Sequence, residues 1–255
     1  MNIKLNAFRN PPVAALVFSR FMWMMPNAVK YANGRDISNL YFNPLDYYWI
    51  PSKRNTFDWV FDQSYDDTYV DVECSNLGCY HKKGIGHGAI EDAEAFGRLK
   101  QAASTIKIKD DILYVVNSYA EKMEGDCLGV HVRVGDMNSG HPQYGVYSTE
   151  DYINKLKTLS FDSLFIASDN FYSIEEIKKN ISKPIIVVDD LLREVTESYT
   201  YATIQMKHID SPELWQQAFI DCLLLSRCSS MLCRVSNLAN AAQVFSSSLK
   251  NIYRL

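Results

Sequence analysis

The pattern of apolar and polar positions is clearest in the second half of the chain, where short apolar runs alternate with amphipathic stretches. Apolar runs of this length, bounded by polar and turn-forming residues, predict buried strands. The four predicted strands are Leu128–Val134, Leu164–Ala167, Ile185–Val188 and Ser230–Cys233. The stretches between them predict helices. Strands that alternate with helices in this way are typical of a parallel sheet covered by helices on both faces.

Capping residues locate the helices of the same region. A serine with an acidic residue three positions later predicts a helix start at Ser148, and again at Ser173, where Glu176 completes a capping box. Proline in a first helical turn marks another start. The predicted helices run from Ser148 to Leu156, from Ser173 onward, from Ser211 to about Arg227, and from Asn237 to Tyr253 with Ser236 as the cap.

The first half of the chain has a weaker pattern, with aromatic, loop-rich sequence between short elements. The predicted elements are a helix at Phe18–Ala32, strands at Leu40–Phe42 and Tyr69–Val72, and an amphipathic helix at Lys109–Lys122. We therefore predict two domains. A smaller, irregular α/β domain takes residues 1–125, and a domain built on a parallel sheet takes residues 126–255.

Composition adds limits on function. Hydrophobic residues make up 47% and charged residues 22% of the 255 residues, as in ordinary globular proteins. The net charge of −4 leaves no basic excess for nucleic acid, so any site for an anion must be local. The 16 Tyr, 12 Phe and 4 Trp residues supply rings that either cover the faces of sugars or fill cores.

Targeting and metal signals are absent from the sequence pattern. The first residues do not read as a signal peptide, and the apolar run from Val13 to Met25 is interrupted by Arg20 and shorter than the about 20 residues that span a bilayer. We expect a protein with no membrane span, cytoplasmic by default. The six cysteines show no C-x-x-C pair and no zinc-like spacing with histidine, which predicts no metal site.

The predicted strand Leu128–Val134 ends within the sequence His131-Val-Arg133-Val-Gly135-Asp136. This sequence combines a cation with a flexible turn. Arg133 offers a planar fork of donors that fits a phosphate, and His131 lies on the same face of the strand. Gly135 lets a ligand approach the backbone, and Asp136 can orient Arg133 or a substrate hydroxyl. Because ligands bind beyond the carboxyl ends of such strands, this tip predicts an anion site. An Arg–Asp ion pair beside a core histidine is the alternative interpretation.

Five further candidate positions lie on neighbouring elements. Asp169 and Asn170 follow the next strand, where they suit ribose or base hydrogen bonds, or form a helix-capping turn. Asp221 lies in an apolar helix, where a carboxylate is costly to bury without a partner. It either faces a ligand or cation, or lies on an exposed helix face. Ser236 and Asn237 begin the last helix, whose N–H groups attract phosphate or are simply capped by the serine.

The segment Gly84-Ile-Gly86-His-Gly88-Ala89 matches the letters of the dinucleotide-binding fingerprint. It follows Tyr80-His-Lys-Lys83 rather than an apolar strand, and it lacks the βαβ frame that the fingerprint requires. We interpret it as a flexible loop between domains or near a substrate. An oxidoreductase that uses these glycines is one alternative hypothesis for the function.

Four segments in the same order cover about half the chain, from Cys127 onward. They are Gly129–Asp136, Phe165–Asn170, Ala218–Ser226 and Leu232–Ala241. Together they resemble the fucosyltransferase superfamily of α1,2-, α1,6- and nodulation-type enzymes, and especially its α1,6 and nodulation-type branch. The resemblance implies an α/β fold of the GT-B type, with two Rossmann-like domains facing each other. Residues 1–125 would form the acceptor side, and residues 126–255 would bind the nucleotide sugar.

The resemblance also implies roles for the candidate residues around a GDP-fucose donor. Arg133 would bind the β-phosphate and stabilise the leaving group. The other implied donor contacts are His131 in the nucleotide pocket, Asp169 and Asn170 near the nucleotide and reacting centre, Asp221 on the base, and Ser236 and Asn237 on the phosphates. The implied reaction inverts the anomeric carbon with no metal or cofactor. A fixed guanidinium and a helix N-terminus can replace a divalent cation.

Two departures from the family pattern bear on function. The glutamate that acts as base in the α1,6 branch is replaced by the stretch Met137–His141, so either His141 or Asp136 would deprotonate the acceptor, and we favour Asp136. The glycine-rich opening of the acceptor domain is replaced by Asn10-Pro-Pro12. Our leading hypothesis is a metal-independent, inverting fucosyltransferase that acts on a glycan. The alternatives are transfer from another nucleotide sugar and a non-catalytic module that binds a nucleotide sugar or glycan.

Overall fold

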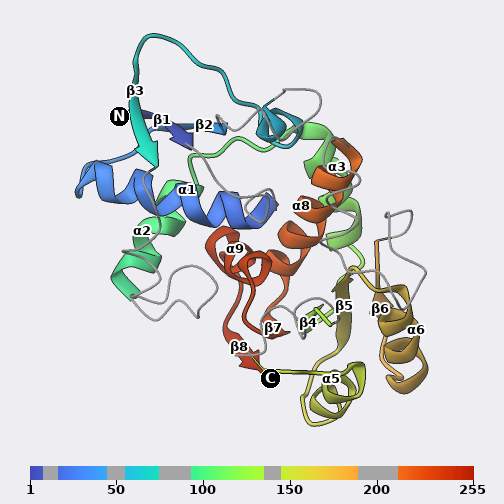
Figure 1. The fold of residues 1–255 in the computed structure, drawn as a ribbon. Coiled ribbons are helices and arrows are strands. Elements are labelled where there is room, and N and C mark those ends of the chain that lie inside the picture. Colours follow the sequence, from blue (N-terminus) through green and yellow to red (C-terminus); the bar gives the residue numbers. More distant parts are fainter. Residues whose placement is uncertain (8–16, 45–54, 75–92, 135–144, 189–211) are drawn as a thin grey trace.

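The computed structural model describes residues 1–7, 17–44, 55–74, 93–134, 145–188 and 212–255. Helices and strands alternate along these residues (Figure 1). The helices are α1 (Val17–Ala32), η3 (a 3-10 helix, Thr56–Trp59), α2 (Ala93–Ala103), α3 (Asp110–Ala120), α5 (Thr149–Leu156), α6 (Phe171–Asn180), α8 (Pro212–Arg227) and α9 (Asn237–Phe245). The strands are β1 (Asn2–Ala7), β2 (Asn39–Pro44), β3 (Tyr69–Cys74), β4 (Cys127–Val132), β5 (Ser163–Ser168), β6 (Ile185–Ile186), β7 (Ser230–Cys233) and β8 (Asn251–Arg254).

The strands form two parallel sheets, one in each half of the chain. The first has the order β2-β1-β3 and the second the order β6-β5-β4-β7-β8. Every strand pair is parallel, as the alternation of strands and helices predicts. In the central strand β1, Ile3 and Leu5 are fully buried while Lys4 between them is partly exposed. The sequence analysis missed β1 and α2, whose apolar positions are too few to mark them.

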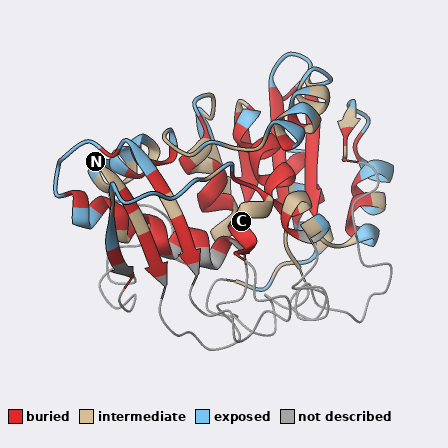
Figure 2. Cartoon of the chain, turned by 90° about the horizontal axis from the view of Figure 1, so that it is seen from above, coloured by how far each residue is buried: buried red, intermediate tan, exposed pale blue. Residues whose placement is uncertain are grey.

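Helices cover both faces of the second sheet. On one face, α5 and α6 pack their apolar sides against Leu128, Val130 and Val132 of β4. On the other face lie α8 and α9, which belong to a larger core that also takes in α1, α2 and the first sheet. Strands β4, β5 and β7 are buried throughout, whereas the edge strand β8 is only partly buried (Figure 2). Different helices therefore cover the two faces of β4, so a ligand can reach this strand only at its end.

A cluster of aromatic rings joins the two halves. Phe219 on α8 contacts Phe18 and Phe21 of α1 with ring centroids 4.8 and 6.1 Å apart, and Phe61 at 5.1 Å. Trp215, one turn earlier, packs edge-on against Phe57 at 5.5 Å. These rings fill the core rather than line a sugar site. The division at residues 125 and 126 stays a prediction, since the two sheets lie on either side of it but share this core.

Several predicted boundaries are wrong, and strand β4, for example, ends at Val132 rather than at Val134. The cap of helix α6 is Asn170 rather than Ser173, three residues earlier, because the Asn170 side chain accepts a hydrogen bond from the Ser173 N–H at 2.9 Å, and the helix begins at Phe171. The last helix ends at Phe245, and Asn251–Arg254 forms a strand beside β7. The Ser246 hydroxyl accepts bonds from two following backbone N–H groups, an arrangement that competes with helix. Strand β6 extends only over Ile185–Ile186.

The predicted helix start at Ser148 agrees with the structure. Ser148 and Asp151 form a reciprocal capping box at the start of α5. The cysteines of the described residues, Cys74 among them, are free and buried. Within the described parts of the chain, no helix has both the length and the apolar character needed to cross a bilayer.

Candidate functional site

The carboxyl ends of β4, β5 and β7 bring the candidate residues of the second half to one rim of the sheet. Val132 is in register with Ser168, so Arg133 and Asp169 each follow a paired residue on adjacent strands. Their side chains form an ion pair of 3.5 Å between Nη1 and Oδ2, and each is 13% exposed. The Arg133 backbone N–H donates to the Tyr152 hydroxyl of α5 at 3.3 Å. The guanidinium is thus held at the rim while it keeps access to solvent.

His131 and Ser236 connect β4 to the first turn of α9. The His131 Nδ1 atom is hydrogen-bonded to Ser236 Oγ at 3.1 Å, and the same Oγ accepts from the Ala239 N–H at 3.1 Å as the N-cap of α9. His131 is 4% exposed. The first N–H groups of a helix lack intrahelical partners and favour anions. The start of α9 therefore lies beside β4, the strand that Arg133 directly follows.

Two arginines that the sequence analysis did not single out add positive charge to this rim. Arg234 follows β7 and is 1% exposed, and Arg254 lies on β8. Burial, together with the charges of Arg133, Arg234 and Arg254, lowers the pKa of His131 to about 3. The imidazole is neutral at physiological pH as a result. Three guanidinium groups concentrate positive charge at this rim of a chain whose net charge is −4, which is the kind of charge that an anion site needs.

Arg234 and Arg254 were obscured in the sequence for different reasons. Arg234 lies inside a segment that carries the family resemblance. We interpreted that segment as a helix start because of the neighbouring residues Ser236 and Asn237. Arg254 falls in the stretch predicted as the end of the last helix, which is a strand in the structure. An arginine directly after an apolar strand, as at Arg133, is the signal that identifies Arg234.

The structure places the remaining candidates near this rim or leaves their surroundings undescribed. The Asn170 side chain caps α6, in line with the capping-turn interpretation. Asp221 is 8% exposed, so the alternative of an exposed helix face is wrong. Its neighbour Cys222 donates from Sγ to the Leu238 carbonyl at 3.9 Å, which sets this turn of α8 against the first turn of α9. Asn237 is the first residue of α9.

Several predicted residues lie outside the described residues. Asp136 and His141, the two candidates for the base, fall within 135–144. The glycine-rich segment Gly84–Ala89 falls within 75–92. Their predicted roles therefore stay predictions. Within the part of the chain that the structure describes, no group of three or more histidine, cysteine, aspartate or glutamate side chains could hold a metal ion.

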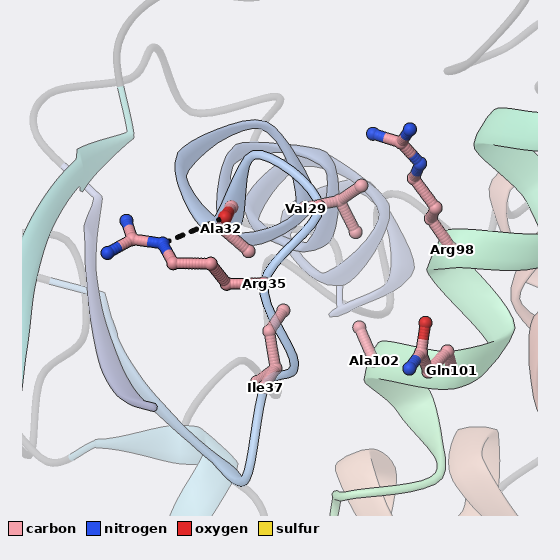
Figure 3. Close-up of a pocket in the computed structure, with 8 residues that line it drawn as sticks. Val29, Ala32, Arg35, Ile37, Arg98, Gln101 and Ala102 are labelled. Carbon is pink, nitrogen blue, oxygen red and sulfur yellow. Dashed lines mark hydrogen bonds between the residues drawn. The ribbon is translucent and has the colours of Figure 1, made fainter.

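A separate pocket lies in the first half of the chain, between the end of α1 and α2 (Figure 3). Its volume is about 170 Å³, and Val29, Ala32, Ile37 and Ala102 line it with apolar surface. The lining arginines Arg35 and Arg98 point in different directions, and each has partners in its own helix region. Their guanidinium groups do not converge on one anion. The pocket is thus a poorer match to a diphosphate than the rim.

Comparisons with known proteins place the fold. No family model matches the chain, and no curated protein matches it significantly in sequence. Among solved structures, the fucosyltransferase NodZ from Bradyrhizobium aligns with a TM-score of 0.56 at 14% identity, over 96% of this chain and 94% of that one. NodZ α1,6-fucosyltransferase co-crystallised with GDP gives 0.57 at 14% identity, and the same enzyme soaked with GDP-fucose gives 0.51 at 16%. Both alignments cover 96% of this chain and 93% of the other.

At this level of identity the similarity concerns the fold. The chain shares the α/β architecture of these fucosyltransferases over nearly its whole length, with parallel sheets in both halves. The predicted GT-B fold class is confirmed.

Proposed function

We propose that the protein is a glycosyltransferase that moves fucose from GDP-fucose to a hydroxyl group of a glycan, with inversion and without a metal ion. The observation that carries the proposal is that Arg133 and the first turn of α9 belong to the same rim: Arg133 follows His131 by two residues, and His131 is hydrogen-bonded at 3.1 Å to Ser236, the cap of α9. The NodZ structures, which share the fold, were obtained with GDP and with GDP-fucose.

The chemistry that this rim suits is the departure of a diphosphate. The acceptor oxygen would attack C1 of the sugar from the face opposite the diphosphate, and the bond from C1 to the phosphate oxygen would break with its electron pair on the β-phosphate. Arg133 and the N-terminus of α9 would stabilise this developing charge, because both are fixed before the reaction. The rim arginines supply the positive charge that a divalent cation would otherwise provide.

The hydroxyl proton would pass to Asp136 or His141, of which we favour Asp136. The carboxylate of Asp136 follows Arg133 by three residues, so the base would act close to the leaving group. We expect Asp136→Asn to abolish transfer and to leave GDP binding within about twofold of the wild type. His141→Gln should retain transfer. If only His141→Gln loses activity, the roles are reversed.

Asp221 and Asn237 belong to the same proposal. Asp221, buried on the turn of α8 that meets α9, would accept hydrogen bonds from the guanine base, and Asn237 with Ser236 would meet the phosphates. Asp169 would orient Arg133, and Asn170 would support this end of β5 from its capping position. The bound partners are thus a nucleotide-sugar donor and a glycan acceptor.

A nucleotide panel tests the proposal. The melting temperature is measured with GDP, UDP and CDP and with their common sugar derivatives, since a ligand that binds only the folded state raises it. We expect the largest shift with GDP and GDP-fucose, and fucose transfer that persists in excess EDTA. No shift with any nucleoside diphosphate would reject the proposed site. A shift without transfer to any acceptor would favour a binding module, and loss of transfer in EDTA would reject metal independence.

A further inference from the structure

We propose that Arg234 is a positioning residue of the donor site, which holds the backbone at Arg133 and at Gly145 and so fixes where the Arg133 guanidinium meets the diphosphate. The inference rests on the proposed function, because it assigns a task to Arg234 within the same site. It adds a residue that does not itself touch the donor.

The contacts of Arg234 join two separate points of the chain. Its Nη1 donates to the Arg133 carbonyl at 3.3 Å, and its Nη2 donates to the Gly145 carbonyl at 2.6 Å. The planar guanidinium carries its donors in a fixed fork, so one side chain can hold two carbonyls at a set separation. Arg133 directly follows β4, and Gly145 lies four residues before the first residue of α5. Arg234 thus links the end of the strand to the approach of the next helix.

The Arg133 peptide groups are held from two sides. The Arg133 carbonyl accepts from Arg234, while the Arg133 N–H donates to the hydroxyl of Tyr152 at 3.3 Å. Arg234 and Tyr152 are both almost completely buried, at 1% and 0% exposure. Two buried side chains, Arg234 directly after β7 and Tyr152 on α5, therefore hold the backbone, and Asp169 holds the guanidinium. A small misplacement of a catalytic group costs a large factor in rate, which gives this support a function.

The electrostatics of Arg234 argue against a purely structural role. A buried guanidinium is unfavourable unless hydrogen bonds or an anion compensate for its charge, and Arg234 is 1% exposed. Its Cζ atom lies 5.4 Å from the centre of the Tyr147 ring, which offers a weak cation–π contact. For packing alone, a methionine of similar length fills the space without the charge. The two carbonyl contacts are what a methionine cannot replace.

The test compares Arg234→Met and Arg234→Lys with the wild type in the full-length protein. The first measurement is amide hydrogen exchange without ligand at the Arg133 N–H and around Gly145. The second is the ratio of the dissociation constants for GMP and GDP, which reports the contact with the β-phosphate. We expect faster exchange in Arg234→Met and a GDP affinity lowered by about 10- to 100-fold, with the GMP affinity nearly unchanged. Arg234→Lys, which can reach one carbonyl, should fall in between.

Two references separate positioning from general damage. The ratio of the GMP and GDP dissociation constants should be the same in the double variant Arg133→Ala/Arg234→Met as in Arg133→Ala alone. The reason is that Arg234 acts through Arg133. Arg98→Met, on the exposed side of α2, should match the wild type in both measurements. If Arg234→Met does not fold, Tyr152→Phe removes the other support of Arg133 and should lower the ratio in the same direction.

Each outcome decides the matter. Wild-type exchange in the Arg234 variants would overturn the contacts themselves. Faster exchange with an unchanged ratio would show that Arg234 holds the chain without positioning Arg133, which overturns the inference and leaves the proposed function intact. A wild-type protein that does not distinguish GDP from GMP would overturn the proposed function first, and the inference with it.

Discussion

The Nδ1 atom of His131 lies 3.1 Å from the Oγ atom of Ser236, and this single contact joins the end of β4 to the start of α9. Both side chains are buried, so the contact is shielded from competing water. It sets the helix N-terminus beside the strand that delivers Arg133. The N-terminus of α9 and the end of the strand that precedes Arg133 are thereby held in a fixed relation.

Replacing Arg133 with alanine should remove most of the transfer activity. In the proposed mechanism the fixed guanidinium would stabilise charge that develops on the leaving phosphate, and loss of one such donor commonly lowers kcat by about 10²- to 10³-fold. The measurement is kcat for fucose transfer from GDP-fucose, together with the melting temperature. Arg98→Ala, an exposed arginine of the first half, serves as the matched control and should keep wild-type turnover. Unchanged kcat in Arg133→Ala would refute its role.

His131 should make the stability depend on pH. The folded protein holds the pKa of His131 at about 3, whereas the unfolded chain protonates histidine near its ordinary pKa of about 6.5. Between these values the unfolded state binds the extra proton. The stability is therefore fully present above pH 6.5 and is lost as the pH falls, with a slope of up to about 1.4 kcal/mol per pH unit.

The measurement is urea denaturation of the wild type and of His131→Gln at several values between pH 7.5 and 5. The difference in unfolding free energy between the two proteins isolates this histidine from the carboxylates, which titrate lower. We expect the wild type to lose stability relative to the variant as the pH falls. Parallel curves would contradict a neutral, buried His131.

Ser236 should contribute to both stability and donor binding. Ser236→Ala removes the N-cap of α9 and the partner of His131, which should cost about 1 kcal/mol of unfolding free energy. The same change should weaken GDP binding by roughly threefold to tenfold. Ser148→Ala removes an equivalent cap from α5 and is the matched control. It should lose similar stability and bind GDP as the wild type does. Equal GDP affinities of the two variants would show that the N-cap of α9 does not contribute to donor binding.

Phe219 should be essential for the cohesion of the two halves. It contacts Phe18, Phe61 and Phe245 within 6.5 Å between ring centroids. Phe219→Ala should lower the unfolding free energy by about 3–5 kcal/mol, measured by urea denaturation with far-UV circular dichroism. The exposed Phe171 of α6 is the control, for which alanine should change stability by less than about 0.5 kcal/mol. If Phe219→Ala lowered the unfolding free energy no more than Phe171→Ala does, the aromatic cluster would not join the two halves.

The second half of the fold follows closely from the sequence. Continuous apolar runs such as the one at Leu164–Ala167 identify strands that are buried on both faces, and serine caps identify Ser148 and Ser236 as helix starts. The errors arise where side chains compete for the backbone. Asn170 displaces Ser173 as a cap, and the serines after Phe245 end the last helix early.

The site was predictable only in part, because it depends on register between strands. The strand tip indicates Arg133, but its ion pair with Asp169 follows from the pairing of Val132 with Ser168, which no local pattern contains. Arg234 is brought to Arg133 by the pairing of β4 with β7, across about 100 residues of sequence. Contacts of this kind between distant segments are what a local sequence pattern does not reveal.

A crystal structure of the protein with bound GDP tests the central claim most directly. The account predicts that the diphosphate lies over the first turn of α9, with an oxygen of the β-phosphate within hydrogen-bond distance of the Arg133 guanidinium. A diphosphate bound away from Arg133, for example between Arg35 and Arg98 in the pocket beside α1, would contradict it.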